Sequence, residues 1–141
     1  MQDDGRIAAA FDDFSEAFRR LTPRGELSLT AASTLRRLER SGPRRLSELS
    51  GPEGVTQPAM TQLVTRLEKD GLAVRSGDPA DGRVVVVRIT DAGRAAIARR
   101  REGRARALSE ALRRLSPEDQ AALVAVLPVL ERLGALITDD T

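Results

Sequence analysis

One β-hairpin pattern stands among segments that otherwise have the periodicity of helices, and this contrast limits the folds available to the chain. Residues 72–76 (LAVRS) and 83–89 (RVVVVRI) are rich in β-branched residues and flank a loop of Gly, Pro and Asp. Two strands alone are only marginally stable in water, so we expect helices to cover one face of the hairpin. Alternation predicts that the covered side chains are Leu72, Val74, Val85, Val87 and Ile89, with Arg75 and Arg88 facing solvent.

Helical patterns precede the hairpin. A second helix is predicted to start at Thr30 as its N-cap and to end at residues 41–43 (SGP), because Gly and then Pro commonly follow a last turn. Ser47 is predicted to cap a short third helix, which Gly51 and Pro52 should end or distort. The opening helix, which residues 22–26 (TPRGE) should break, is predicted from an apolar stripe at three- and four-residue steps: Ile7, Phe11, Phe14, Phe18 and Leu21.

The segment from Gln57 to Asp70 predicts an amphipathic helix. Thr56 is its expected N-cap, and Pro58 falls in the first turn, where its missing N–H does no harm. Gly71 should end it. The apolar face comprises Met60, Leu63, Val64 and Leu67. The polar face comprises Gln57, Thr61, Gln62, Thr65 and Arg66.

Two long helices are predicted after the hairpin. Thr90 and Asp91 should cap the first, which runs to about Leu115. Ser116 should cap the second, and Pro128 is expected to kink it. Its apolar residues are Leu123, Val124, Leu127, Leu130, Leu133 and Ile137.

Composition excludes several classes of site. The chain has no Cys, His, Trp or Tyr, which excludes disulfides, His/Cys metal sites and Ser-His-Asp catalysis. We therefore expect no enzyme, no metal and no cofactor. The acidic N-terminus lacks the pattern of a signal peptide, and no apolar stretch is expected to approach the length of a membrane span, which predicts a cytoplasmic protein. The net charge of +2 does not by itself indicate a polyanionic partner.

The order of three helices and a hairpin predicts a winged helix-turn-helix, in which the second helix of the turn enters the DNA major groove. Gln, Thr and Arg on the polar face of 57–70 can reach base edges and phosphates. Arg83 at the hairpin tip could enter the minor groove, held by a bidentate pair with Asp81. The alternatives are a solvated helix face with a free loop arginine, or a winged domain used only for protein–protein association.

The sequence resembles the MarR family of bacterial transcriptional regulators over essentially its whole length. The most specific segments are VTQPAMTQLVTRLEKDGL, DPADGR and ITDAG, at the expected separations. The resemblance implies a homodimer that represses transcription from a near-palindromic operator and is released by a small molecule, often an aromatic acid. The implied DNA-binding residues are Ser47, Gln57, Thr61, Gln62, Thr65, Arg66, Arg75, Asp81 and Arg83.

Two features bear on that resemblance. Family members usually continue the supporting helix where this chain has SGPEG, so Gly51 and Pro52 should shorten or bend it. The absence of Tyr, His and Trp leaves few side chains to bind a phenol or to stack on an aromatic ligand. An arginine could hold a carboxylate, and a repressor without any effector remains an alternative.

The terminal helices carry more apolar residues than one small winged domain needs. We expect them to form the core of a dimer, although packing within one chain is the alternative. The predicted interface residues are Phe11, Phe14, Phe18, Leu123, Leu127, Leu130 and Leu133. The basic run Arg99, Arg100, Arg101, Arg104 and Arg106 is interpreted as a solvated helix face, with DNA or an anionic ligand as alternatives.

The predicted fold is thus mainly α-helical, with a small β-hairpin wing. It is expected to form one domain over residues 1–141. Residues 30–90 would form the winged helix-turn-helix, and residues 1–29 and 91–141 the helical dimerisation part.

Overall fold

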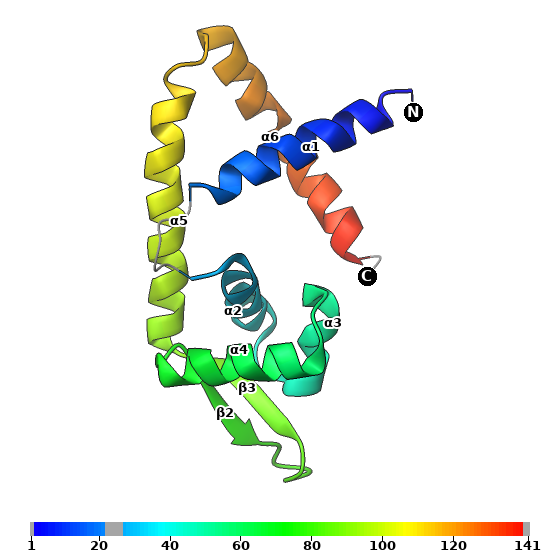
Figure 1. Cartoon of the computed structure of the whole chain (residues 1–141), viewed down its shortest axis with the longest axis vertical. Coiled ribbons are helices and arrows are strands. Elements are labelled where there is room, and N and C mark those ends of the chain that lie inside the picture. The colour runs from blue at the N-terminus through cyan, green and yellow to red at the C-terminus, as the bar shows by residue number, and fades with distance from the viewer. Residues whose placement is uncertain (1, 22–26, 140–141) are drawn as a thin grey trace. The chain divides into compact units, whose positions relative to one another are not determined.

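The computed structural model describes residues 2–21 and 27–139 and confirms a mainly helical chain with a small antiparallel sheet (Figure 1). The elements are α1 (Asp4–Arg19), α2 (Leu29–Ser41), β1 (Arg44–Arg45), the 3₁₀ helix η1 (Leu46–Glu48), α3 (Ser50–Glu53), α4 (Gln57–Lys69), β2 (Ala73–Gly77), β3 (Val85–Ile89), α5 (Asp91–Leu112) and α6 (Pro117–Asp139). The chain separates into two compact units, Met1–Arg104 and Ala105–Thr141. The predicted break at 22–26 lies outside the described residues.

The sheet has three strands in the order β1-β3-β2, one more than the sequence predicts. The extra strand consists of Arg44 and Arg45, which pair with Val87 and Val86 of β3. Two residues directly after Pro43 are too short for alternation to reveal. The extra strand joins the segment before η1 to the hairpin, so the wing is part of a small sheet.

The inward face of the hairpin is predicted only in part. Val87 and Ile89 are buried, as expected, but Val74 is 47% exposed and Val85 is 37% exposed. Ala73 is 1% exposed, because β2 begins there and Ala73 pairs with Ile89. Side chains alternate along a strand, so burying Ala73 turns Val74 to the outer face.

The core of the first unit lies between α2, α4 and the sheet. Leu35 and Leu38 of α2 meet Met60, Val64 and Leu67 of α4, and all five are at most 2% exposed. Burying each of these side chains stabilises the fold by roughly 1.5–3 kcal/mol before entropy is counted. This packing fixes which face of α4 points outward.

The N-cap of α2 is Ser28, so the prediction of Thr30 is wrong. The Oγ of Ser28 accepts the backbone N–H of Ala31 at 3.1 Å, and Ser28 has the extended backbone of a cap. Thr30 already lies in the first helical turn. Either hydroxyl residue suits a cap, and the actual start depends on where the helix packs.

The supporting element before α4 is divided into η1 and α3. Ser47 lies inside η1 and makes no capping bond there. Gly51 and Pro52 lie within α3 instead of ending it, because Pro52 is in the first turn, where no N–H is needed. Gly54, with φ of +63°, ends the helix in the left-handed conformation. The supporting helix is therefore short, as predicted, but it ends at Gly54 and not at Gly51 or Pro52.

The start of α5 lies very close to the hairpin. Thr90 Oγ1 donates to the carbonyl of Gly71 at 2.6 Å and accepts the N–H of Gly93 at 3.0 Å. A Cβ on Gly93 would collide with the carbonyl oxygen of Leu72 and lie 2.8 Å from Cγ1 of Ile89. Glycine at this position permits the approach of α5 to the strand ends.

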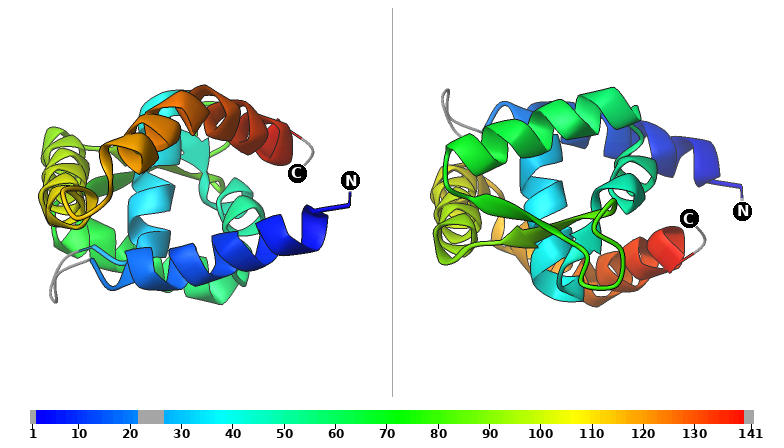
Figure 2. Two further views of the ribbon diagram at one scale, coloured as in Figure 1. Left: turned by 90° about the horizontal axis from the view of Figure 1, so that it is seen from above. Right: turned by 90° about the horizontal axis from the view of Figure 1, so that it is seen from below.

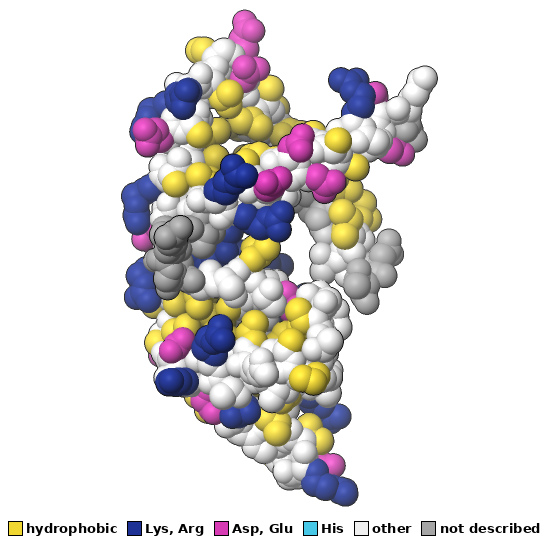
Figure 3. All heavy atoms as spheres, viewed as in Figure 1, with side chains coloured by type: hydrophobic (Ala, Val, Ile, Leu, Met, Phe, Trp, Pro, Cys, Tyr) yellow, Lys and Arg dark blue, Asp and Glu magenta, His cyan; other side chains and the backbone are white. Residues whose placement is uncertain are grey.

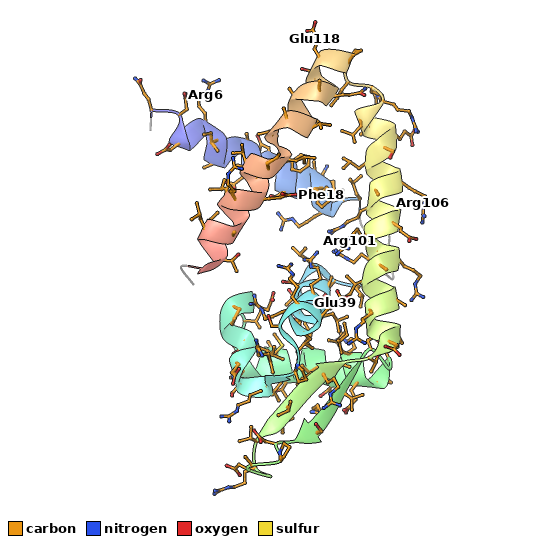
Figure 4. The ribbon with its side chains drawn as sticks, turned by 180° about the vertical axis from the view of Figure 1, so that it is seen from behind. Arg6, Phe18, Glu39, Arg101, Arg106 and Glu118 are labelled. Atoms are coloured by element: carbon orange, nitrogen blue, oxygen red, sulfur yellow. The ribbon has the colours of Figure 1, made fainter. Side chains whose placement is uncertain are left out.

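The basic run on α5 is not a uniformly solvated face, so that interpretation is wrong for two of its residues. Arg100 is 4% exposed, and its Nε donates to the carbonyl of Leu27 at 3.1 Å. Arg104 is 9% exposed, and its guanidinium carbon lies 4.7 Å above the centre of the Phe18 ring. Figure 4 shows Arg101 projecting from α5 on the side of α1 and α2.

The second unit contains α6, which begins at the predicted place. Ser116 Oγ accepts the N–H of Asp119 at 3.1 Å, which confirms the cap. Among the described residues, the segment Pro117–Thr138 is long and apolar enough to cross a membrane by length and composition, with a mean hydropathy of 1.8. The expectation that no apolar stretch reaches this length is therefore wrong. Composition does not separate a lipid-facing helix from one that packs against protein.

Candidate nucleic-acid interface

The first part of the interface is the outer face of α4. The Oγ1 of Thr56 accepts the N–H of Ala59 at 3.3 Å, which confirms the predicted N-cap. Met60, Val64 and Leu67 are buried, so the opposite face is turned to solvent. The sequence-predicted residues on that face are Gln57, Gln62, Thr65 and Arg66, all exposed, and Thr61, which is half-buried. Seen from below, α4 and the hairpin both face the viewer (Figure 2, right).

Internal hydrogen bonds decide what these side chains can offer a ligand. Thr61 and Thr65 donate their hydroxyl hydrogens to the carbonyls of Gln57 and Thr61, at 3.0 and 2.8 Å. In this conformation both hydroxyls can only accept from a partner. Gln62 makes no side-chain hydrogen bond to any other described residue, so its amide can both donate and accept. That pair of groups matches the major-groove edge of adenine.

The start of α4 is tied to the supporting element. Gln57 Nε2 donates to the carbonyl oxygen of Ser47 in η1 at 2.8 Å. Both residues are exposed, and the Ser47 hydroxyl remains on the surface. The bond leaves the Gln57 amide oxygen available as an acceptor. Two sequence-predicted site residues are thus in direct contact.

The second part of the interface is the tip of the hairpin. Asp81 Oδ1 accepts from the backbone N–H of Arg83 at 3.0 Å and from its Nε at 3.4 Å. One oxygen makes both contacts, so the predicted bidentate pair is wrong in geometry, although the partner is correct. The Arg83 side chain is 94% exposed. Figure 3 shows Lys and Arg side chains at this end of the molecule.

Arg75 lies on β2 and is held by α4. The Glu68 carboxylate accepts the backbone N–H of Arg75 at 2.8 Å and lies 3.2 Å from its Nη2. These hydrogen bonds, the backbone one first, lower the pKa of Glu68. Glu68 was not among the predicted site residues, although it is the sole acid of α4 and a lone acid on a helix with a polar face is a signal that the sequence offers. Glu68 holds the Arg75 guanidinium in an ion pair between α4 and β2.

A second ion pair holds the hairpin from its other side. Nη2 of Arg45 lies 3.5 Å from Oδ2 of Asp78, and Nε of Arg45 lies 3.8 Å from Oε1 of Glu48. Asp78 Oδ1 also accepts the N–H of Ala80 at 2.8 Å. Arg45 was not among the predicted site residues, because its strand was not predicted.

A cluster of arginines lies away from this surface, on α2 and α5. The pKa of Arg36 is lowered by burial and by the positive charges of Arg40 and Arg101. The pKa of Arg104 is lowered by burial and by the charge of Arg36. No group of three or more residues that could hold a metal ion occurs within 2–21 and 27–139. The cluster on α2 and α5 therefore concentrates positive charge.

The residues predicted for the dimer interface are exposed within the single chain, except for Phe18. Values for α1 are 40% for Phe11 and 55% for Phe14, while Phe18 is half-buried under Arg104 and stacks on Phe14 at 5.6 Å. The α6 residues have exposed fractions of 43% for Leu123, 51% for Leu127, 37% for Leu130 and 39% for Leu133. Each helix therefore presents uncovered apolar surface, which is visible over α6 in Figure 3.

A supporting element, a polar helix and an arginine-tipped hairpin define the class of this protein: a winged helix-turn-helix DNA-binding regulator of transcription. The MarR family model matches residues 27–85, the part that contains α2 to the start of β3. The chain belongs to the MarR family.

Relatives and solved structures agree with this assignment. The uncharacterized HTH-type regulator YfiV of Bacillus subtilis is 30% identical over 107 residues, covering 76% of this chain and 67% of YfiV. The HTH-type repressor IacR of Pseudomonas putida is 30% identical over 96 residues, covering 68% and 58%. The regulator Tm0710 of Thermotoga maritima has a similar structure, with 29% identity, a TM-score of 0.70 and 94% coverage of both chains.

One further structure concerns a ligand. BpsR of Bordetella bronchiseptica, whose DNA binding is regulated by 6-hydroxynicotinic acid, matches with a TM-score of 0.61 and 23% identity. The match covers 90% of this chain and 91% of BpsR. At this identity the similarity concerns the fold.

Proposed function

We propose that this protein is a cytoplasmic, homodimeric repressor that binds a near-palindromic operator in double-stranded DNA. In each subunit α4 lies in the major groove. The observation that carries the proposal is the outer face of α4, where Gln62 has its whole amide available and Arg66 is exposed. Gln57, Thr61 and Thr65 supply acceptors beside it. Amide and guanidinium groups are the side chains that read adenine and guanine most directly.

The wing supplies the second contact. Arg83 extends from the hairpin tip into the minor groove, where the narrow groove concentrates negative potential. Asp81 orients it through the backbone and Nε bonds. Arg75 takes part by holding β2 to α4 through Glu68. The exposed hydroxyl of Ser47 contacts a phosphate near the start of the supporting element.

Two copies are needed to read two half-sites. The exposed apolar residues of α1 and α6 provide the surface for this association. Burying each Leu or Phe contributes roughly 1.5–3 kcal/mol before entropy. The same burial accounts for the apolar composition of α6 without a membrane.

We further propose that a small acidic ligand, of the aromatic-acid type, releases the repressor from DNA. The similarity to IacR supports repression, and the ligand of BpsR supports an aromatic acid. Arginines of the cluster on α2 and α5 carry the charge that a carboxylate requires. A ligand that binds the DNA-free conformation more tightly shifts the population away from the operator.

Binding to the DNA upstream of the protein's own gene tests the proposal. In a gel shift, the wild-type protein should retard this duplex in the presence of excess bulk competitor DNA. Steep weakening with rising salt is expected, because phosphate contacts release counterions. A thermal-shift panel of aromatic acids, followed by operator release, then identifies the ligand. Equal binding to all duplexes, even at low ionic strength, would contradict the function.

A further inference from the structure

The outer face of the small sheet carries an ion pair that crosses its central strand. Arg45 of β1 is opposite Val86, and Val86 is opposite Ser76, so these three side chains stand in one row on one face. Asp78 follows Ser76 by two residues, directly after β2, on the same face. The Arg45 guanidinium reaches over β3 to this carboxylate, with 3.5 Å between Nη2 and Oδ2.

The opposite face of the hairpin is held by a different pair. Arg75 is opposite the buried Val87 and bonds to Glu68 of α4. The hairpin is therefore attached to α4 on its inner face and to β1 on its outer face. Two attachments on opposite faces restrict rotation of the hairpin about its own long axis.

Arg45 also connects the hairpin to the start of α4. Its Nε lies 3.8 Å from Oε1 of Glu48 in η1, and the neighbouring Ser47 accepts the bond from Gln57. Asp78 in turn shapes the loop toward the tip, since it accepts from Ala80 and donates its own N–H to the carbonyl of Val84 at 2.9 Å. These polar contacts, together with the peptide bond between Ser47 and Glu48, connect the first residue of α4 to the wing loop.

We propose that Arg45 and Asp78 are positioning residues for DNA binding. Their ion pair sets the place of the wing tip, and with it Arg83, relative to α4. Neither residue acts by touching a base. This inference rests on the proposed DNA-binding function.

The sign of one substitution separates this role from simple charge effects. Asp78→Asn keeps an oxygen to accept from Ala80 but removes the charge that holds Arg45. Two simpler roles predict that Asp78→Asn binds the operator more tightly. In one, Asp78 only repels phosphates; in the other, it only keeps Arg45 from contacting DNA. If the ion pair positions the wing, Asp78→Asn binds about two- to fivefold more weakly, the range expected for a partly exposed pair.

A double-mutant cycle completes the test. Arg45→Gln and Asp78→Asn should each weaken operator binding, and the double variant should be no weaker than the weaker single variant, because both break one interaction. Additive losses, or tighter binding by Asp78→Asn, would overturn the inference. Arg88→Gln is the matched control, since it removes one exposed positive charge from β3 and Arg88 has no ion pair among the described residues.

A footprint distinguishes positioning from general loss of structure. In Asp78→Asn, hydroxyl-radical protection under the wing should fall as it does in Arg83→Ala, while guanine protection in the major groove and the thermal midpoint of the free protein stay unchanged. Loss of both protections together would overturn the inference. If the wild-type protein does not bind the operator, the proposed function itself fails. If it binds and all variants match it, only the positioning role fails.

Discussion

The carboxylate of Glu68 accepts the backbone N–H of Arg75 at 2.8 Å, so the last full turn of α4 is bonded directly to the first strand of the wing. The same carboxylate lies 3.2 Å from the Arg75 guanidinium. The helix proposed to read the major groove and the strand that carries the wing are thereby held in one arrangement. Glu68, the sole acid of α4, is therefore already bonded to a residue of the same chain.

This contact predicts a contribution to stability that depends on pH. The fold lowers the pKa of Glu68, so the contribution of this carboxylate is full above its ordinary pKa of about 4.5 and is lost as pH falls through the lower folded value. Glu68→Gln should lower the thermal midpoint at pH 7, and the difference from wild type should shrink in acid. Thermal unfolding of both proteins between neutral and acidic pH measures this, and a constant difference would contradict it.

Arg83 should contribute to affinity mainly through charge. We expect Arg83→Ala to weaken operator binding and to reduce the slope of log K against log salt by about 0.9, the value for one phosphate contact on duplex DNA. Titration at several salt concentrations measures the slope. Arg6 is an exposed arginine on α1 (Figure 4), and the control variant Arg6→Ala should leave the slope unchanged. A slope identical to wild type would remove Arg83 from the DNA contacts.

Gln62 should contribute specificity at one base pair. Gln62→Ala should cost about 1–3 kcal/mol on the operator and little on nonspecific DNA. Substituting the base pairs of the operator in turn locates the contact, because the base change that weakens binding by the wild-type protein should not weaken binding by Gln62→Ala. A uniform loss on all sequences would instead indicate a phosphate contact.

Gly93 should be intolerant of even a methyl group. Gly93→Ala forces a Cβ against the Leu72 carbonyl and Ile89, and overpacking of this kind costs about 1–3 kcal/mol or more. Denaturant unfolding measures the loss. Gly51→Ala is the matched control, because a Cβ there meets nothing within 4 Å. Equal stability of the two variants would contradict the close approach of α5 to the hairpin.

Leu127 should support association of two chains. Leu127→Asp places a charge on the apolar surface of α6 and should convert the dimer to a monomer at micromolar concentration in sedimentation. Arg132→Ala, at a charged position of the same helix, should remain dimeric. A wild-type protein that sediments as a monomer would contradict the proposed dimer.

The sequence predicted most of the elements that make up the interface. Local signals were sufficient for α4, whose cap at Thr56 and alternation of polar and apolar faces agree with the structure. They were insufficient for β1, because two residues carry no periodicity. They were also insufficient for β2, where Ala73 is buried in place of the predicted Val74 because the strand is shifted by one residue. The basic run on α5 looked solvated because charge patterns do not show which neighbours cover Arg100 and Arg104.

Local sequence signals specify the order of helices and hairpin, the polar face of α4 and the arginine of the wing, because caps, periodicity and turn residues act over a few neighbouring positions. The pairing of Glu68 with Arg75 and of Arg45 with Asp78 follows from how α4 and the strands pack in the folded chain. The second pair joins residues 33 positions apart through a strand that pairing alone creates. Such contacts depend on the register between strands, which no local pattern in this chain specifies.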